Sequence, residues 1–507
     1  MKYLVLWEIS KKQEYVFKSN KLKENIGASL IIKDLTENLE KFNIKEENIV
    51  FRGGGKSLCM FSNGDDALNF IENFSIKTLK EYTGIEVFFA INDFNEEKYD
   101  IINAIEELYS NLESKKSMRK SSAERLSFGI EKICKSTGMP AFCYDDDERE
   151  ISREINTKKN RCEASQNDEF KEYIPKGYKL TTEIQKLNAK NKEDSKNYMA
   201  IIHIDGNGMG KKFNKLKDYV KLRNGQSMKE HNEEYLNALK NFSENVDKVY
   251  KNAFKDMCNK IGENKEKLLE VTSIDDGIFP LRPLIIAGDD ITYVANGYIG
   301  IETARIFIEK LTEQKIEIVK EKEIDLNACA GVAIVKTTYP FIKAYDLAEE
   351  LCRNAKKIVI KKGQGKDYSA IDWHIEQGEI CGSIKDIREK FYSLENSSQD
   401  KEPKLTLRPY FINNEELWNY NDFKCYYNRI IELLNNKNIG RNKIKQLREV
   451  LIKGKKSTEY FLKFNKMENC FPYIKKGTIG DYCFNTIDEK CMYFDPIEIM
   501  DMLIPLE

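Results

Sequence analysis

The chain has 507 residues, which is too long for one hydrophobic core and predicts two to four domains. With 41% hydrophobic and 33% charged residues the composition is that of a globular protein, and a net charge of −1 excludes a basic field over the whole surface that would attract nucleic acid. The amino terminus is too short in apolar residues for a signal peptide and no apolar run is long enough to span a membrane, so we expect a cytoplasmic protein with reduced cysteines.

Residues 1–95 alternate between strand-like and helix-like patterns. Apolar runs predict strands, and apolar residues spaced three and four apart predict helices. The predicted elements are a strand at 2–9, a helix at 22–42, a hairpin with a glycine tip at 48–62, a helix at 65–82 and a strand at 85–93. This βαββαβ order is the ferredoxin-like pattern.

Residues 197–378 repeat that order with longer insertions. The predicted elements are strands at 198–205, 326–335 and 368–375, helices at 232–261, 301–319 and 345–362, and a hairpin at 283–296. The repeat predicts an internal duplication, in which the tip Gly53-Gly54-Gly55 aligns with Gly288-Asp289-Asp290.

The remaining segments are helical or polar. Residues 96–196 open with a helix at 100–116, and the polar stretch 157–196 predicts a surface loop over part of its length. After a second polar break at 394–404, three amphipathic segments complete a C-terminal helical domain at 379–507. The sequence therefore predicts an α+β chain with two ferredoxin-like domains, a helical segment between them and a helical domain after them.

Cysteine and histidine do not form an obvious metal site in the sequence. No CxxC pair occurs, and the only loose cluster is Cys134, Cys143 and Cys162, whose spacing fits no compact zinc site. Three histidines occur in all, and none stands in an HExxH motif. We therefore expect no zinc, and structural thiols instead.

An apolar run that ends in Asp205 is followed by a glycine-rich loop. An aspartate here is often only a strand end or a helix cap. The loop changes this reading, because Gly206, Asn207, Gly208, Met209 and Gly210 would let backbone N–H groups approach a ligand, and a helix N-terminus after glycines favours anions. Lys211 and Lys212 add positive charge, so the loop would suit a triphosphate.

A second acidic motif, Gly288-Asp289-Asp290, lies between two apolar strands. Turn chemistry alone explains glycine and aspartate at a hairpin tip. Two adjacent carboxylates nevertheless repel each other unless a cation lies between them. If this hairpin lies beside the strand that ends at Asp205, three carboxylates could hold two divalent cations for an in-line phosphoryl displacement.

Other candidates are weaker. Lys356 lies on the predicted helix 345–362, where a solvated lysine is the simpler reading, although its place in the repeat would let it reach a phosphate. Asp65 and Asp66 open a helix, for which N-capping is sufficient. The segment GGGKS at 53–57 fails as a phosphate-binding loop, because Val50 stands where its first glycine should be.

These motifs resemble those of a known family. DGNGMG, the AGDD hairpin, CAGVAIV and YDLAEELCRNAKK resemble the second palm domain of the large polymerase-like subunit of type III CRISPR interference complexes, which is related to GGDEF and nucleotide cyclase palms. The segments SNKLKENIGASLII and FRGGGKSLCMF resemble the first palm of that family, here in a degenerate form. The C-terminal region would correspond to the helical closing domain.

The resemblance implies a function in antiviral defence. It implies ATP as substrate, Mg²⁺ or Mn²⁺ as cofactor, and cyclic or linear oligoadenylates as products. By motif position, Asp205, Asp289 and Asp290 would hold the metals, and Asn207, Gly208 and Gly288 would line the nucleotide pocket. RNA or CRISPR effector subunits are the implied partners, and a homodimer stays open.

Two departures from the family pattern affect the prediction. Ala287 replaces the usual first glycine of the hairpin motif, but its methyl group is small enough to keep catalysis plausible. The first palm begins at residue 1, so we expect a member without the HD nuclease, which could act alone.

Two hypotheses follow. The leading one is a metal-dependent nucleotidyltransferase that makes oligonucleotide second messengers from NTPs. The second is a scaffold subunit that binds a nucleotide or RNA without turnover. The intact aspartates favour the enzyme, and a single-palm dinucleotide cyclase is disfavoured because the chain carries two palms.

Overall fold

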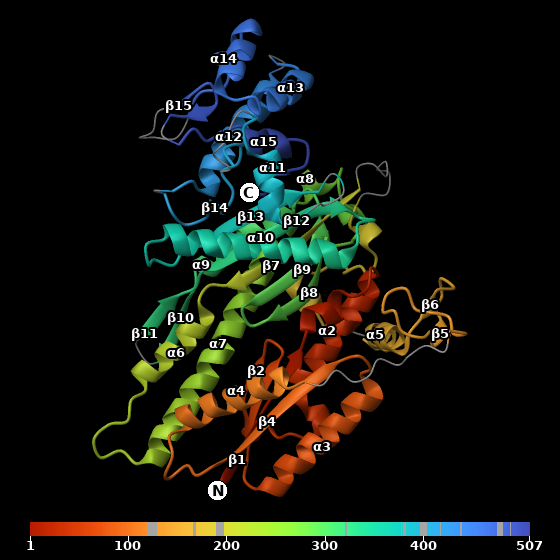
Figure 1. Ribbon diagram of the computed structural model, residues 1–507, viewed down its shortest axis with the longest axis vertical. Coiled ribbons are helices and arrows are strands. Elements are labelled where there is room, and N and C mark those ends of the chain that lie inside the picture. Colours follow the sequence, from red (N-terminus) through yellow and green to blue (C-terminus); the bar gives the residue numbers. More distant parts are fainter. Residues whose placement is uncertain are drawn as a thin grey trace.

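Two sheets and a helical domain follow one another along the long axis of the molecule (Figure 1). The computed structural model describes residues 1–119, 129–165, 169–188, 197–319, 322–376, 378, 382–395, 403–415, 417–436, 439–473, 480–486 and 488–507. The N-terminal sheet lies at one end, the larger central sheet lies in the middle, and the C-terminal helices lie at the other end.

The N-terminal sheet confirms the ferredoxin-like prediction. Its strand order is β2-β3-β1-β4, with every neighbouring pair antiparallel. The helix predicted at 22–42 ends at Thr36 and is followed by a short 3₁₀ turn. The elements are β1 (Lys2–Ser10), α1 (Lys12–Phe17), α2 (Leu22–Thr36), β2 (Ile49–Gly53), β3 (Lys56–Phe61), α3 (Gly64–Glu81) and β4 (Glu86–Phe94).

Local chemistry explains why α3 starts where it does. The Asn63 side chain accepts a hydrogen bond from the backbone N–H of Asp66 at 2.7 Å, so Asn63 is the N-cap. Asp65 and Asp66 lie in the first turn, where negative charge favours the helix dipole. These two acids therefore have the structural role that was predicted for them.

The central sheet repeats the same topology and extends it. Its order is β14-β13-β12-β7-β9-β8, in which the four strands β12-β7-β9-β8 match the order of the N-terminal sheet, and β13 adds a parallel neighbour to β12. The elements are β7 (Tyr198–Gly206), α6 (Met209–Tyr219), α7 (Met228–Glu263), α8 (Lys265–Leu268), β8 (Leu281–Ala287), β9 (Asp290–Asn296), α9 (Gly300–Thr312), β10 (Lys315–Val319), β11 (Lys322–Asp325), β12 (Ala328–Lys336), α10 (Phe341–Lys362), β13 (Ala370–Ile375) and β14 (Tyr410–Phe411).

One helix prediction in this region is wrong in its length. The helix expected at 301–319 ends at Thr312, and Lys315–Val319 forms strand β10. This segment alternates charged with β-branched residues, which favours a strand, and it pairs with β11 in a separate two-stranded sheet.

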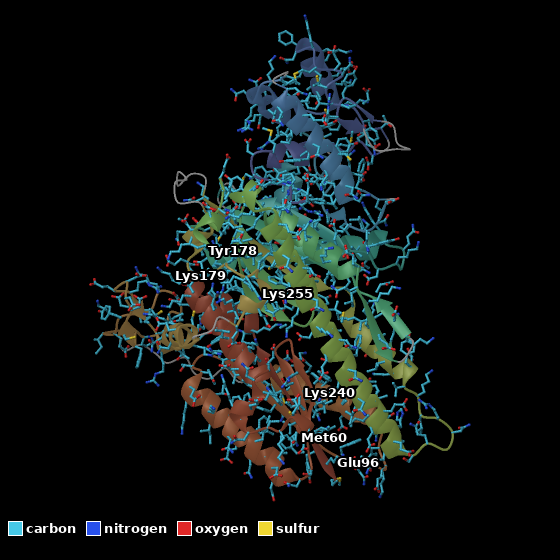
Figure 2. All side chains as sticks on the ribbon, turned by 180° about the vertical axis from the view of Figure 1, so that it is seen from behind. Met60, Glu96, Tyr178, Lys179, Lys240 and Lys255 are labelled. Carbon is cyan, nitrogen blue, oxygen red and sulfur yellow. The ribbon has the colours of Figure 1, made fainter. Side chains whose placement is uncertain are left out.

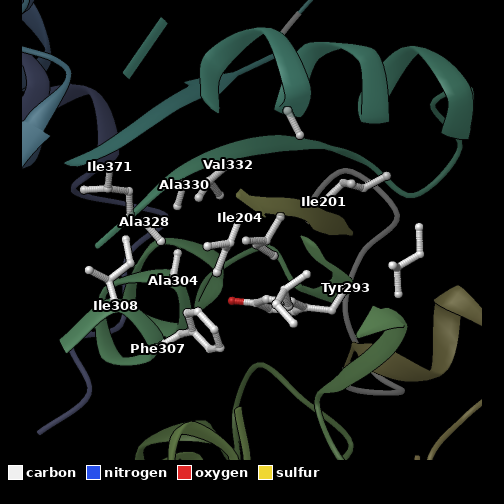
Figure 3. Packing of buried hydrophobic residues seen from close by; sticks show 14 of the residues in the cluster. Ile201, Ile204, Tyr293, Ala304, Phe307, Ile308, Ala328, Ala330, Val332 and Ile371 are labelled. Carbon is white, nitrogen blue, oxygen red and sulfur yellow. The ribbon is translucent and has the colours of Figure 1, made fainter. Parts of the chain in front are cut away.

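The core of the central sheet fixes the strands that carry the predicted site. On one face, Ile204 and Ala330 are cross-strand neighbours and lie against α9, where Phe307 and Tyr293 pack beside them (Figure 3). On the other face α10 comes so close that a Cβ at Gly331 would lie 1.9 Å from the backbone oxygen of Ala348. Helices on both faces hold β7 and its neighbours rigidly.

Helix α7 connects the two sheets. It is the long helix that runs beside both of them, with Lys255 near the central sheet and Lys240 near the N-terminal one (Figure 2). A capping box at Ser227 and Glu230 fixes its first turn. The two ferredoxin-like units are therefore packed together through a common helix.

The segment between the sheets is more ordered than the sequence suggested. It contains α4 (Ile101–Ser117), β5 (Cys143–Tyr144), β6 (Glu150–Ile151) and α5 (Arg153–Ala164). The part of the polar stretch from 157 to 164 is helical, because α5 packs on α2 and its Lys158 ammonium bonds Glu154 and the backbone oxygen of Tyr15. Residues 189–196, at the end of that stretch, lie outside the described residues.

The C-terminal domain is helical as predicted. Its elements are α11 (Ile384–Phe391), α12 (Tyr420–Asn435), α13 (Arg441–Leu451), α14 (Lys455–Phe464), β15 (Gly480–Asp481), β16 (Phe484–Asn485) and α15 (Phe494–Ile499). Much of the predicted polar break at 394–404 lies outside the described residues. None of the helices in the described ranges combines the length and the apolar character needed to cross a bilayer.

Candidate active site

The three predicted acids lie at one end of the central sheet. Asp205 and Asp290 are direct cross-strand partners in the β7–β9 pair, so their side chains leave the same face of the sheet. Asp289 precedes Asp290 at the hairpin tip, and its backbone oxygen accepts a hydrogen bond from the N–H of Gly206 at 3.1 Å. The hairpin tip therefore adjoins residue 205, as the sequence predicted.

Gly206 is required for this close approach. A Cβ at this position would lie 2.5 Å from the hydroxyl oxygen of Tyr250 and 2.8 Å from the Cβ of Asp289. Tyr250 is fully buried on α7, and its hydroxyl has no hydrogen-bond partner among the described residues. Burial and the charges of Asp289 and Asp205 raise the pKa of Tyr250 well above its usual value, so this hydroxyl remains a proton donor.

The other residues of the loop are held by the local backbone or by contacts with neighbouring elements. Gly208 has φ +61° and forms the N-cap position of α6, where a left-handed backbone favours glycine. Asn207 is buried, and its side-chain amide donates to the backbone oxygen of Tyr368 at 2.8 Å. That contact of the amide nitrogen fixes the loop, and the side-chain oxygen Oδ1 has no hydrogen-bond partner among the described residues. Lys212 pairs with Asp367 at 3.0 Å.

Lys356 does reach the site, but its contact is with an acid. Its ammonium nitrogen lies 2.6 Å from Asp205 Oδ2 and 2.8 Å from the backbone oxygen of Gly206. Burial is the largest single effect and lowers the pKa of Lys356, but the charge of Asp205 and the hydrogen bond to it, with smaller contributions from nearby groups, together raise it. Lys356 therefore orients Asp205 in this arrangement, where the sequence had suggested a phosphate contact.

A second lysine, which the sequence did not single out, contacts the other acid. Lys12 Nζ lies 2.8 Å from Asp290 Oδ2 and 3.1 Å from the backbone oxygen of Gly54. Burial lowers the pKa of Lys12, but the attraction of Asp290, Asp289 and Asp205 raises it above its usual value. Lys12 is the first residue of α1, beside the N-terminal sheet, and lies 278 residues before its partner in the sequence. No local sequence signal points to such a contact.

The two neighbouring acids of the tip differ in their electrostatics. Burial raises the pKa of Asp289 to about 6, and the charges of Asp205 and Asp290 add to this effect. Burial would also raise the pKa of Asp290, but Lys12 and then His203 hold it below its usual value. The ionised form of Asp290 is therefore favoured, whereas the charge of Lys356 offsets only part of the increase in the pKa of Asp289.

A cavity of about 560 Å³ opens beside the hairpin tip, between the two sheets. It is lined by the tips of both hairpins and by the start of α6. Apolar and aromatic side chains also line it, together with charged ones such as Glu106, Lys217 and Asp247. Among the lining residues are Gly54, Met209, Gly210, Gly288, Asp289, Phe51, Tyr109, Phe213 and Tyr235. Cavities of this size hold small ligands such as nucleotides.

The donor set fits a hard divalent cation, although the acids contact lysines here. Carboxylate oxygens are the ligands that Mg²⁺ and Mn²⁺ prefer. Asp290 Oδ1 is buried and has no hydrogen-bond partner in the described part of the chain, with His203 Nδ1 3.7 Å from it, so this oxygen could accept a ligand. Within the described ranges no three His, Cys, Asp or Glu side chains are arranged to hold one ion, so Asp205 and Asp290 would have to turn from their lysines.

Comparison with known families identifies this region. Residues 198–368 match the family Cas10/Cmr2, second palm domain. The match includes all three acids and Lys356. We therefore call the central sheet with its helices the second palm, and β1 to β4 with their helices the first palm.

Solved structures extend the likeness over the whole chain. Three of them are crystal structures of the apo Csm1–Csm4 cassette, of the cassette in complex with cA4, and of the Csm1–Csm4 subcomplex in the type III-A CRISPR-Csm interference complex. The identities are 13%, 12% and 13%, and the TM-scores are 0.56, 0.54 and 0.54. The matches cover 99% of this chain and 70%, 69% and 69% of those chains. At such identities they show a common fold. No curated protein matches the chain.

Proposed function

We propose that this chain is a metal-dependent nucleotidyltransferase that makes cyclic or linear oligonucleotides, in particular oligoadenylates, from NTPs in CRISPR-type antiviral defence. One observation carries the proposal. Asp205 and Asp290 face each other across two strands, and the adjacent Asp289 lines a cavity large enough for a nucleotide. A structural role would not require three carboxylates at one point, because like charges opposite each other destabilise a sheet.

The similar structures support the nucleotide class. Crystal structures of the Csm1–Csm4 cassette that share this fold are complexes with cA4, cA3, pppApA or ATP. These ligands belong to those proteins. For this chain they support ATP as the first substrate to test and oligoadenylates as the products to look for.

The proposed roles follow from the positions of the side chains. Asp205, Asp289 and Asp290 would hold Mg²⁺ or Mn²⁺, which would lower the pKa of the attacking 3′-hydroxyl and stabilise the departing pyrophosphate. The glycine-rich loop before α6 would offer backbone N–H groups and the helix N-terminus to the phosphates. The hydroxyl of Tyr250 is a further donor beside the acids.

The cavity gives the nucleotide a direction. The phosphates would lie near Gly288 and Gly210, and the base would lie against the aromatic side chains of Tyr109, Phe213 and Tyr235. Aromatic rings stack on any base, so these side chains support binding without fixing the choice of base. The 3′-hydroxyl of one nucleotide would attack the α-phosphate of another, and pyrophosphate would leave.

The direct test is product formation from each labelled NTP with Mg²⁺ or Mn²⁺, followed by separation of the products. We expect ATP to give oligonucleotides and pyrophosphate, and the Asp289→Ala/Asp290→Ala variant to give none. A matched control is Asp65→Ala/Asp66→Ala, which removes two adjacent acids from the start of α3. Pyrophosphate release at the native rate by the Asp289/Asp290 variant would show that the assignment is wrong.

A second function, nucleotide or RNA binding without turnover, is favoured by a different observation. Lys356 and Lys12 already neutralise two of the three acids, and such pairs could make the acids purely structural. A scaffold of this kind would bind NTP in the cavity, and the binding would be insensitive to divalent cations. Measuring ATP affinity with and without Mn²⁺ therefore separates the two functions.

A further inference from the structure

Lys12 connects the first palm to the acids of the second palm. It is the first residue of α1 and directly follows the turn that ends β1. Its ammonium group bonds the carboxylate of Asp290 at 2.8 Å and the backbone oxygen of Gly54 at 3.1 Å. The glycine tip of the first palm thus orients Lys12 toward the hairpin of the second palm.

The position of the ammonium group is one that a cation would use. Lys12 contacts Oδ2 of Asp290, while Oδ1 is buried and lacks a hydrogen bond within the described residues. The side chains of Lys12 and Asp290 are only 19% and 14% exposed, so water screens their charges poorly. A divalent cation on Asp290 would lie close to this ammonium group, and the two positive charges would repel each other.

We propose that Lys12, a residue of the first palm, belongs to the reaction site. Its ammonium group pairs with Asp290 until a cation binds there, and then moves to contact the phosphates of the nucleotide. The proposal rests on the proposed function and deepens it. Gly54, which holds Lys12, also lines the cavity beside Asp289, so the phosphates would lie within reach of a small movement of the side chain. Lysine suits this exchange because its flexible stem carries a compact charge.

The proposal predicts effects of opposite sign on the two ligands. Without Lys12 the acids lose a competing cation, so they bind Mn²⁺ more tightly when no nucleotide is present. Without Lys12 the phosphates lose a positive partner, so the nucleotide binds more weakly when Mn²⁺ is present. If Lys12 only held the two palms together, its loss would instead lower thermal stability and leave the affinity for Mn²⁺ unchanged.

Other contacts also hold the two palms together, so a purely structural role of Lys12 can be tested. The hydroxyl of Ser29 on α2 donates to the backbone oxygen of Leu284 on β8, and α7 packs along both units. Loss of Lys12 should therefore leave the palms together. We expect Lys12→Met and Lys12→Gln to fold, as judged by an unchanged circular dichroism spectrum.

The experiment is a titration of the full chain with Mn²⁺, followed by electron paramagnetic resonance of the free ion. We expect Lys12→Met to bind Mn²⁺ about tenfold more tightly than the wild type, and Lys12→Arg to stay close to it. The control is Lys11→Met, which removes an exposed neighbouring lysine that pairs only with Glu14 at 3.4 Å among its recorded ion pairs. In the Asp290→Asn background, Lys12→Met should have no further effect on Mn²⁺ affinity.

A second titration uses an ATP analogue with a methylene group between the α and β phosphates, in the presence of Mn²⁺. We expect Lys12→Met to weaken its binding about tenfold. An unchanged or weaker affinity for Mn²⁺, or an unchanged affinity for the analogue, would overturn the proposal for Lys12 alone. If the wild type bound no Mn²⁺ even with the analogue, the proposed function would fail, and Lys12 would fail with it.

Discussion

The same topological position carries opposite chemistry in the two palms. In the first palm, the first residue after the hairpin tip is Lys56, and its cross-strand partner on β1 is Glu8. In the second palm, the first residue after the tip is Asp290, and its partner on β7 is Asp205. Both hairpins close the same way, since Gly53 pairs with Lys56 and Ala287 pairs with Asp290.

The charges of the two pairs are compensated in different ways. Glu8 and Lys56 neutralise each other at 3.2 Å, and Lys116 adds a second contact to Glu8 at 2.5 Å. Asp205 and Asp290 are two like charges, which repel unless positive groups come from elsewhere. Here Lys356 and Lys12 supply these groups. The first palm is thus electrostatically complete, whereas the second palm depends on partners that could be exchanged for a metal.

The largest expected effect comes from equivalent substitutions in the two palms. Asp205→Asn should lower the rate of oligonucleotide formation by at least about 1000-fold, because it removes a proposed metal ligand. Glu8→Gln, its counterpart in the first palm, should lower the rate less than about threefold and mainly cost stability. Product formation from labelled ATP measures both. Equal losses in the two variants would contradict the asymmetry between the palms.

The next effect concerns the pH dependence of stability at the two neighbouring acids. The pKa of Asp289 is raised from 3.8 to about 6, so the folded state binds this proton more tightly than the unfolded state. Asp289 therefore destabilises the fold increasingly as pH rises from about 4 to about 6, and at most by about 3 kcal/mol above that range. Without divalent cations, Asp289→Asn should raise the midpoint of thermal unfolding at pH 7.5 and have little effect near pH 4.

Asp290 provides the matched comparison, because the pKa of its carboxyl is lowered. Its charge stabilises the fold above its unfolded pKa, and that contribution is lost as pH falls through the folded value. Asp290→Asn should therefore lower the midpoint at pH 7.5, which is the opposite sign. Midpoints that shift in the same direction in both variants would contradict the electrostatic difference inferred within this hairpin.

The smallest expected effect tests the packing around the acids. Gly206→Ala should destabilise the second palm by about 1–3 kcal/mol, because the added methyl group meets Tyr250 and Asp289 at 2.5 and 2.8 Å. Gly210→Ala is the control in the same loop, since an added methyl group there meets nothing within 4 Å. Gly210 lies in α6, where alanine should stabilise the helix by about 0.5–1 kcal/mol. Thermal unfolding in the presence of EDTA distinguishes the two.

The sequence predicted most of the fold because its elements are signalled locally. The glycine tip at 53–55, the strand that ends at Asp205 and the hairpin at 288–290 each stand between apolar runs of the expected period. Two copies of one pattern also predicted a ferredoxin-like unit in each half of the chain. The prediction was wrong at 315–319, because the segment resembles the end of α9 in its period and becomes a strand only through its pairing with β11.

The sequence by itself determined the two ferredoxin-like units and the meeting of Asp205 with the hairpin acids, because both follow from the order and period of neighbouring elements. Only the tertiary structure decided that Lys12 faces Asp290, that Tyr250 closes over Gly206, and that a cavity opens between the palms. These contacts join residues from separate elements, and their distances depend on how whole units pack. Such contacts therefore cannot be predicted from the hydrophobic periodicity of either segment alone.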